Sequence, residues 1–206
     1  MQPHRINSRL FLWGILGVCG LLILLTTSTF AQGGHSIFLP WITTPAIPLP
    51  NGDFESIPVI WVTLPNDIQL IYAQDEMPEG IIPHSGNHAA WLGDHGSSSQ
   101  SHETEIRQTV IAPGNTPILR FWIWIHSGES CAYTKDKLLV YSNEELINEM
   151  SLCQDKNTYS WSQRILRLPL ATGESATLRI VVTTENSGLF SPTSEVYLDD
   201  FIFATH

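Results

Sequence analysis

Short runs of alternating apolar and polar residues, separated by turn-forming residues, constrain the fold of this chain most. They recur from about residue 58 to the C-terminal end, and the segments between them are rich in Gly, Pro, Asn and Ser. A period of two places alternate side chains on opposite faces of a strand, and no long stretch keeps a helical period. We expect strands at 58–63, 68–73, 87–92, 103–111, 117–126, 136–142, 145–152, 160–168, 175–184 and 195–203.

Many short strands at even spacing are typical of an antiparallel sandwich or barrel. The predicted fold class is therefore all-β, an antiparallel β-sandwich. One stretch, 143–150, could instead form a helical turn, because its apolar residues are few and unevenly spaced. We favour a strand there.

The first 31 residues have the pattern of a secretory signal peptide. Arg5 and Arg9 precede an apolar run over 10–25, and the small residues Thr29 and Ala31 occupy the −3 and −1 positions of a cleavage site. A retained membrane helix is the alternative, but the run is shorter than the roughly 20 residues that a spanning helix prefers. We therefore expect cleavage after Ala31, a secreted or cell-surface protein, and no stable membrane span after cleavage.

A proline-rich segment, 32–50, follows the predicted signal peptide. Proline lacks a backbone donor and interrupts periodic structure, so this segment is predicted to be a linker or extended arm. Its apolar side chains would allow it to dock on the domain or on an envelope component. The folded domain is then expected to span 51–206.

Composition excludes several classes of protein. With ten basic and twenty acidic residues and a formal net charge of -10, the chain is unsuited to nucleic acid, whose phosphates require Lys and Arg. Its 15% charged and 10% aromatic residues exclude a disordered polyelectrolyte. We expect neither a nucleic-acid partner nor a polybasic membrane patch.

Two cysteines, Cys131 and Cys153, lie beyond the signal peptide. In an exported protein two cysteines most simply form a disulfide, and if the segment 135–152 between them is a hairpin, the bridge would join its ends. Two free thiols are the alternative.

The segment 118–126 shows the sharpest contrast between the two faces of a predicted strand. Its odd-numbered positions from 119 to 125 are all large and apolar, so this face belongs to the core. The other face carries Arg120, Trp122, Trp124 and His126. Pyranose rings present C–H faces that pack on indole, so this face is a candidate sugar-binding platform. The alternative is that loops or the 32–50 arm cover the tryptophans, because large aromatic side chains are usually buried.

Several short motifs occur in a definite order along the chain. They are 51–55 (NGDFE), Trp61, 85–93 (SGNHAAWLG), 106–110 (IRQTV), 119–122 (LRFW), 136–140 (DKLLV), Trp161 and 196–203 (VYLDDFIF). In this order, the chain resembles the galactose-binding-like jelly-roll superfamily of carbohydrate-binding modules and MAM-like adhesion domains over nearly all of 51–206. It lacks the fixed cysteine set of MAM domains, which favours a bacterial secreted module. The resemblance implies a jelly roll whose first and last motifs lie side by side.

The resemblance also implies a structural Ca²⁺ between the first and last strands. Calcium takes six to eight oxygen ligands, and Asp53, Glu55, Asp199 and Asp200 supply carboxylates at these two ends of the domain. Neighbouring residues of a strand point to opposite faces, so we expect only one of Asp199 and Asp200 to bind. The alternative is that backbone N–H groups satisfy the inward carboxylate.

The histidines His84, His88, His95 and His102 match no familiar zinc motif. We expect them in a solvated loop, from which His88 or His95 could contact a sugar on the tryptophan face.

Catalytic motifs are not evident. The sequence has no G-x-S-x-G, H-E-x-x-H or glycine-rich phosphate loop. Carboxylates for glycoside hydrolysis would have to come from Glu103, Glu105, Glu129 or Asp136, and their spacing singles out no acid–base pair. We predict an exported, non-catalytic module that binds carbohydrate, such as an envelope glycan. The alternatives are a MAM-like adhesion module that binds another surface protein, and a jelly-roll polysaccharide-degrading enzyme.

Overall fold

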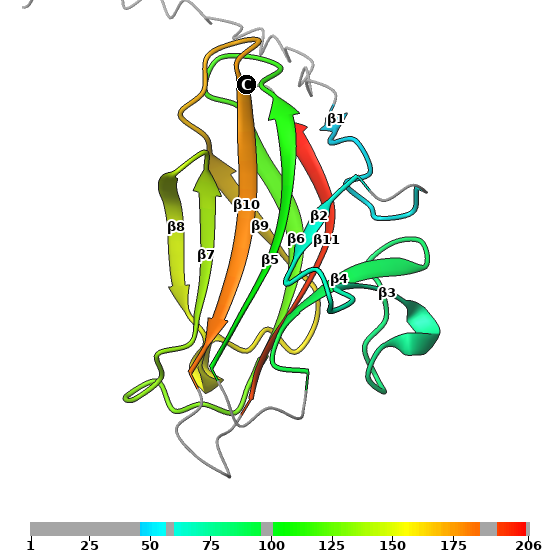
Figure 1. The fold of residues 1–206 in the computed structure, drawn as a ribbon, viewed down its shortest axis with the longest axis vertical. Coiled ribbons are helices and arrows are strands. Elements are labelled where there is room, and N and C mark those ends of the chain that lie inside the picture. Colours follow the sequence, from blue (N-terminus) through cyan, green and yellow to red (C-terminus); the bar gives the residue numbers. More distant parts are fainter. Residues whose placement is uncertain (1–45, 57–59, 96–100, 186–192, 205–206) are drawn as a thin grey trace, which may run out of the picture. The chain divides into compact units, whose positions relative to one another are not determined.

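The computed structural model describes residues 46–56, 60–95, 101–185 and 193–204, which form two antiparallel sheets packed face to face (Figure 1). One sheet has the strand order β3-β4-β11-β6-β9, with β1 beside β11, and the other has the order β2-β5-β10-β7-β8. The strands are β1 (Ile47–Pro48), β2 (Val62–Leu64), β3 (Ile71–Ala73), β4 (His88–Gly93), β5 (His102–Ile111), β6 (Ile118–Ser127), β7 (Lys137–Ser142), β8 (Glu145–Ser151), β9 (Ser162–Arg167), β10 (Ser175–Thr184) and β11 (Ser194–Ala204), with 3-10 helices η1 (Gln74–Glu76) and η2 (Gln154–Lys156). The predicted all-β sandwich is confirmed.

Every predicted strand overlaps an observed one, and the stretch that could have formed a helical turn is the strand β8. The predicted linker differs at its end. Ile47 and Pro48 form β1 and pair with Phe203 and Ile202 of β11, and Leu49 is buried in the core. These residues therefore belong to the sandwich, and the boundary predicted at residue 51 falls a few residues late.

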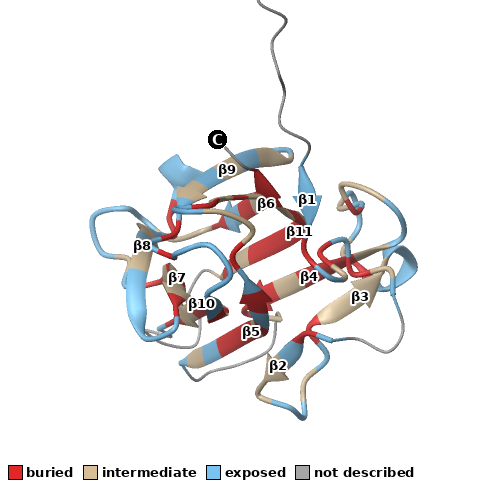
Figure 2. Cartoon of the chain, turned by 90° about the horizontal axis from the view of Figure 1, so that it is seen from above, coloured by how far each residue is buried: buried red, intermediate tan, exposed pale blue. Residues whose placement is uncertain are grey.

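The core lies between the two sheets and is supplied by one face of each strand. In β6, Leu119, Phe121, Ile123 and Ile125 are all buried, as the alternation predicts. Figure 2 shows that β5, β10 and β11, in the middle of the sheets, are largely buried, whereas β8 and β9 at one edge are mostly intermediate or exposed. The sandwich is therefore held by burial of the inner faces of its central strands.

The first and last sequence motifs meet in this core. Phe54 and Phe201 pack edge to face with ring centroids 6.0 Å apart, Trp61 lies 5.1 Å from Phe201, and Phe121 stacks on Phe201 at 4.9 Å. The Phe201 amide donates to the Gly52 carbonyl at 2.9 Å. A Cβ on Gly52 would lie 2.2 Å from the Phe201 carbonyl oxygen, so glycine is required for this approach. The side-by-side arrangement implied by the resemblance is present.

Cys131 and Cys153 form the predicted disulfide. The bridge lies at the open end of the β7–β8 hairpin, where Lys137 pairs with Ser151. It therefore joins the two segments that flank the hairpin, as the spacing of the cysteines predicts.

The predicted signal peptide and residues 32–45 of the predicted arm lie outside the described residues, so export stays a prediction. Within the described ranges, no helix is long and apolar enough to cross a membrane.

Candidate functional site

The predicted aromatic face is the outer face of β6, turned away from the core. In the register with β11, Trp122 stands opposite Asp199 and Trp124 opposite Tyr197. Both tryptophans and Arg120 are half-buried, and His126 is exposed with its Nδ1 atom 3.6 Å from the Glu195 carboxylate. The four residues therefore share one face, as the alternation predicts.

The segment between β3 and β4 covers part of this face. The His84 ring stacks on Trp122 with centroids 4.0 Å apart and planes 17° apart. The Trp161 indole N–H donates to the Ile82 carbonyl at 2.8 Å, and the Trp161 ring meets Trp124 edge-on at 6.2 Å.

This covered face has a small apolar cluster of its own. Met77 and Tyr197 are buried in it, with Ile81, Trp124 and Trp161 packed against them. The open platform that we expected is therefore absent from this conformation, and sugar binding by Trp122 and Trp124 stays a prediction. The expectation of solvated histidines is wrong for His84, because the segment that carries it docks on the aromatic surface.

The acidic residues of the first motif contact the same segment. Glu55 accepts hydrogen bonds from the Asn87 and His88 amides at 2.7 and 2.6 Å, and its other oxygen lies 3.1 Å from the His88 Nδ1 atom. Asp53 is exposed, and its carboxylate accepts the Glu55 amide at 3.3 Å. Glu55 thus anchors the start of β4, whereas Asp53 closes a local turn.

The two aspartates of the last motif also converge on this segment. Asp199 is fully buried and accepts the Ser85 amide at 3.1 Å, while Asp200 accepts the Ser85 hydroxyl at 2.7 Å and pairs with the His84 Nδ1 atom. Strand alternation predicts opposite directions for these side chains, and that prediction is wrong. Asp200 has a left-handed φ of 52°, at an irregularity in the β6–β11 register, and both carboxylates reach Ser85.

The predicted calcium ligands are Asp53, Glu55, Asp199 and Asp200, and most of their carboxylate oxygens accept hydrogen bonds within the protein. Both oxygens of Glu55, Asp199 and Asp200 already face hydrogen-bond donors, including the Asp200 amide, which donates to Asp199 at 2.8 Å. Across the described ranges, no three His, Cys, Asp or Glu side chains gather closely enough to hold a metal ion. With their oxygens engaged in these hydrogen bonds, the four carboxylates do not form a set of ligands that fits a cation. Calcium binding stays a prediction from the resemblance.

Asp199 has the most strongly perturbed carboxyl of this region. Its pKa is raised from the ordinary value of 3.8 to about 7, chiefly by burial and also by the Asp200 charge, against the opposing influence of the backbone N–H groups of Ser85, Asp200 and His84. Because the pKa of the folded state exceeds that of the unfolded state, the folded chain holds this proton more tightly between about pH 4 and 7. The stability contributed by this group is complete below about pH 4 and is lost as the pH rises through 7.

We therefore expect Asp199→Asn to flatten the pH dependence of stability. Relative to the variant, the wild-type chain should lose stability on going from pH 5 to pH 8, on the order of 2–4 kcal/mol by proton linkage. Denaturant unfolding of both proteins at the two pH values measures the difference. Parallel profiles for the two proteins would contradict burial as the controlling influence on this carboxyl.

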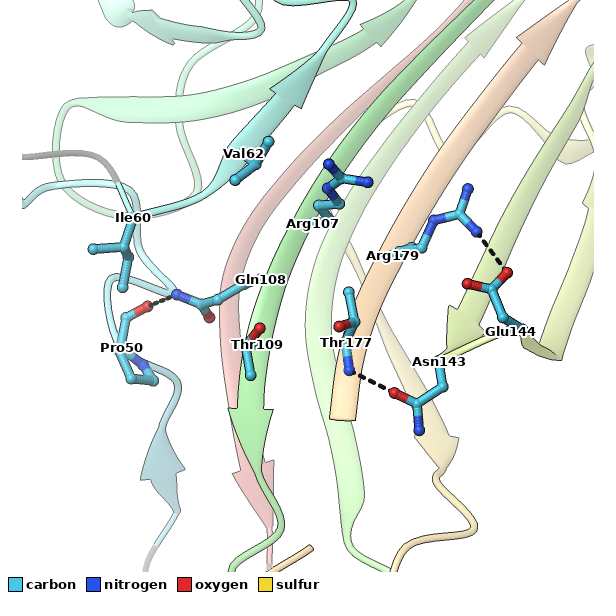
Figure 3. Close-up of a pocket in the computed structure, with 10 residues that line it drawn as sticks. All are labelled: Pro50, Ile60, Val62, Arg107, Gln108, Thr109, Asn143, Glu144, Thr177 and Arg179. Atoms are coloured by element: carbon cyan, nitrogen blue, oxygen red, sulfur yellow. Dashed lines mark hydrogen bonds and ion pairs between the residues drawn. The ribbon is translucent and has the colours of Figure 1, made fainter. Parts of the chain in front are cut away.

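A groove of about 800 Å³ lies on the other sheet, on the outer face of β5 and β10 (Figure 3). The register of these strands sets two rows of polar side chains across its floor, with Arg107 opposite Arg179 and Thr109 opposite Thr177. Figure 3 shows Ile60, Val62 and Pro50 on one side of the floor and Asn143 and Glu144, from the β7–β8 turn, on the other.

The floor of the groove is held in place by a buried carboxylate. Glu105 is 2% exposed, and its Oε2 atom accepts from the Nε and Nη2 atoms of Arg179 at 3.0 and 2.7 Å. Arg107 lies 3.6 Å from the other oxygen, and Glu144 lies 3.5 Å from Arg179. The two arginines are thus balanced by two carboxylates. Glu105, one of the carboxylates that glycoside hydrolysis would have to use, is a buried partner of these arginines.

Gln108 gives the groove a further polar group. Its side chain is almost fully buried, and its amide nitrogen donates to the Pro50 carbonyl at 2.8 Å. Its amide oxygen is buried without a hydrogen-bond partner among the described residues. On the other side of the floor, the side-chain oxygen of Asn143 accepts the Thr177 amide at 2.9 Å. The acceptors that the groove offers to a ligand are therefore the threonine hydroxyls, and its donors are these hydroxyls and the arginines.

Comparisons with known proteins show the fold. No family model matches the chain, and no curated protein sequence matches it. TmCBM61 in complex with β-1,4-galactotriose is similar in structure, with a TM-score of 0.51 and 17% identity over 78% of this chain and 99% of that chain. The K3 cleaved adhesin domain of Lys-gingipain from Porphyromonas gingivalis w83 has a TM-score of 0.48, with 17% identity over 77% and 99% of the two chains. A cyclase from Fischerella sp. TAU has a TM-score of 0.47, with 13% identity over 78% and 96%.

At these identities, the similarity to TmCBM61 establishes a shared β-sandwich fold and leaves the ligand to be argued from this chain's own residues.

Proposed function

We propose that the chain is a non-catalytic carbohydrate-binding module whose ligand lies in the groove over β5 and β10. The observation that carries this proposal is the groove itself. Its volume of about 800 Å³ falls in the range of small-molecule sites and is large enough for a short oligosaccharide. The fold is one that TmCBM61, solved with a galactotriose, also has.

The lining matches the chemistry of a polyhydroxylated ligand. A sugar hydroxyl both donates and accepts, and the groove offers the hydroxyls of Thr109 and Thr177, which can also do both, beside the arginine donors. Ile60 and Val62 are 43% and 48% exposed on one wall, where they can pack against the C–H face of a ring. Because the two arginines already face Glu105 and Glu144, the groove suits a neutral glycan better than a polyanion.

A glycan array followed by calorimetry tests the proposal. The first variant combines Arg107→Ala with Thr109→Ala, which changes two outward side chains of β5 and leaves the core face of the strand intact. We expect it to bind the best array ligand about 10- to 100-fold more weakly, which corresponds to the loss of a few net hydrogen bonds.

Two controls separate the groove from the aromatic face. Arg167→Ala, on an exposed position of β9, should bind like wild type. Trp122→Ala with Trp124→Ala changes the predicted platform; if this variant alone loses binding while retaining a cooperative melt, the sugar site is the aromatic face and the groove is excluded. Failure of the wild-type chain to bind any glycan would favour the adhesion alternative, which pull-down with envelope proteins would then examine.

A further inference from the structure

We propose that the segment 81–88 is an intramolecular ligand. Its N–H and O–H groups occupy the positions that a cation would take on Glu55, Asp199 and Asp200. Its His84 ring occupies the position that a sugar ring would take on Trp122. The resemblance implies a cation site in this region, and strand alternation in 118–126 predicts an aromatic platform beside it. The structure places one continuous segment of the chain on both. These contacts lie on the opposite sheet from the groove, so the two proposals are tested separately.

The contacts with the carboxylates have the chemistry of a substitute for a cation. Glu55 comes from the first motif and the two aspartates from β11, so the three acidic groups approach the segment from both ends of the domain. They receive donors from four of the five residues of 84–88, namely His84, Ser85, Asn87 and His88. Several N–H groups that point at clustered carboxylates supply positive potential without a metal ion. A cation bound at the same oxygens would have to displace them.

Gly86 shows that the segment is shaped for this position. Its φ is +58°, in the left-handed region that favours glycine, and a Cβ there would lie 2.5 Å from the Glu55 Oε1 atom. The carboxylate therefore approaches the backbone of the segment at the one residue without a side chain.

The segment 81–88 also contacts the aromatic face of β6 and the neighbouring Trp161. The His84 imidazole is nearly parallel to Trp122 at 4.0 Å, the geometry in which a planar or ring-shaped ligand stacks on indole. The Ile82 carbonyl accepts the Trp161 indole N–H, which would otherwise be available to a ligand. Because His84 also pairs with Asp200, the same side chain joins the two halves of the contact.

The test compares the full chain in EDTA and in excess calcium, with the melting temperature and the hydrogen exchange of 81–92 as readouts. We expect the wild-type melting temperature and the protection of this segment to be the same in both solutions. A melting temperature or protection that falls in EDTA and recovers with calcium would overturn the proposal, because a cation would then be holding these carboxylates. This measurement needs no variant and therefore does not depend on the folding of a mutant.

A double variant, His84→Ala with Ser85→Ala, tests the same contacts by removing the groups that donate to Asp200. It removes both side-chain donors to Asp200 and uncovers Trp122. We expect faster exchange over 81–92, a lower melting temperature, and a gain of several degrees when calcium is added, because the Asp200 oxygens are then vacant. His126→Ala, an exposed histidine on the same face, is the matched control and should behave like wild type. Unchanged exchange in the double variant would contradict the proposal.

Discussion

Replacing Phe201 with alanine is expected to lower the free energy of unfolding by about 4 kcal/mol. Phe201 is fully buried where the first and last motifs meet, and its ring contacts Phe54, Trp61 and Phe121. Truncation of a buried Phe removes its transfer free energy and leaves a cavity, which together cost about 3 to 5 kcal/mol. The rings around it belong to different segments and are held by the backbone, so the cavity can collapse only in part.

For a domain of this size, such a loss corresponds to a fall in melting temperature of about 10 to 15 °C. Thermal and denaturant unfolding of the variant and the wild type measure it. Ile165→Ala is a suitable control, since this side chain is 57% exposed on β9 and its removal should cost about 0.5 kcal/mol or less. If the Phe201→Ala and Ile165→Ala variants proved equally stable, the contact between the motifs 51–55 and 196–203 would not be central to the core.

The fold could be predicted from the sequence because strand alternation is a local property. A strand such as β6 carries its apolar residues on every second position, so this face must be covered by another layer, and a sequence without helical periods offers only strands for that layer. The disulfide was predictable for a similar reason, since Cys131 and Cys153 flank one hairpin. What could not be predicted is the short β1, because the pairing of Ile47 and Pro48 depends on the edge of β11, far along the chain.

The candidate sites were less accessible to sequence reasoning because they depend on contacts between distant segments. Alternation correctly placed Trp122 and Trp124 on one face, but the docking of His84 on that face is a tertiary contact without a local signal. The bulge at Asp200 turned its side chain toward Ser85, and a positive φ at a non-glycine residue is not evident from sequence.

The groove was missed for a related reason. Arg107 and Arg179 are both outward residues of strands with an apolar inner face, which is a visible signal. That they stand opposite one another is a matter of register between β5 and β10, and many registers satisfy the same apolar pattern. The buried position of Glu105 between them follows only once that register is known.

Glu105→Ala is the second change for which we expect a large effect, a loss of about 3 to 5 kcal/mol in the free energy of unfolding. The carboxylate is buried and accepts two N–H groups from Arg179, with Arg107 beside its other oxygen. Alanine removes two charge-assisted hydrogen bonds, leaves a cavity at a buried position, and leaves Arg107 and Arg179 opposite each other with only the exposed Glu144 beside Arg179. The arginines should then separate, so glycan affinity in the groove should fall together with stability.

Glu144→Ala supplies the matched control for the same arginine. Its side chain is 93% exposed and lies 3.5 Å from Arg179, so the pair is screened by water and its loss should cost less than about 1 kcal/mol. Denaturant unfolding of the two variants, with calorimetry on the glycan that the wild type binds, measures both effects. Equal losses of stability would mean that burial does not strengthen the Glu105 pair. A destabilised Glu105→Ala variant with unchanged glycan affinity would mean that the positions of the two arginines do not matter to the ligand, and the groove would then have to bind through its threonine and aliphatic side chains alone.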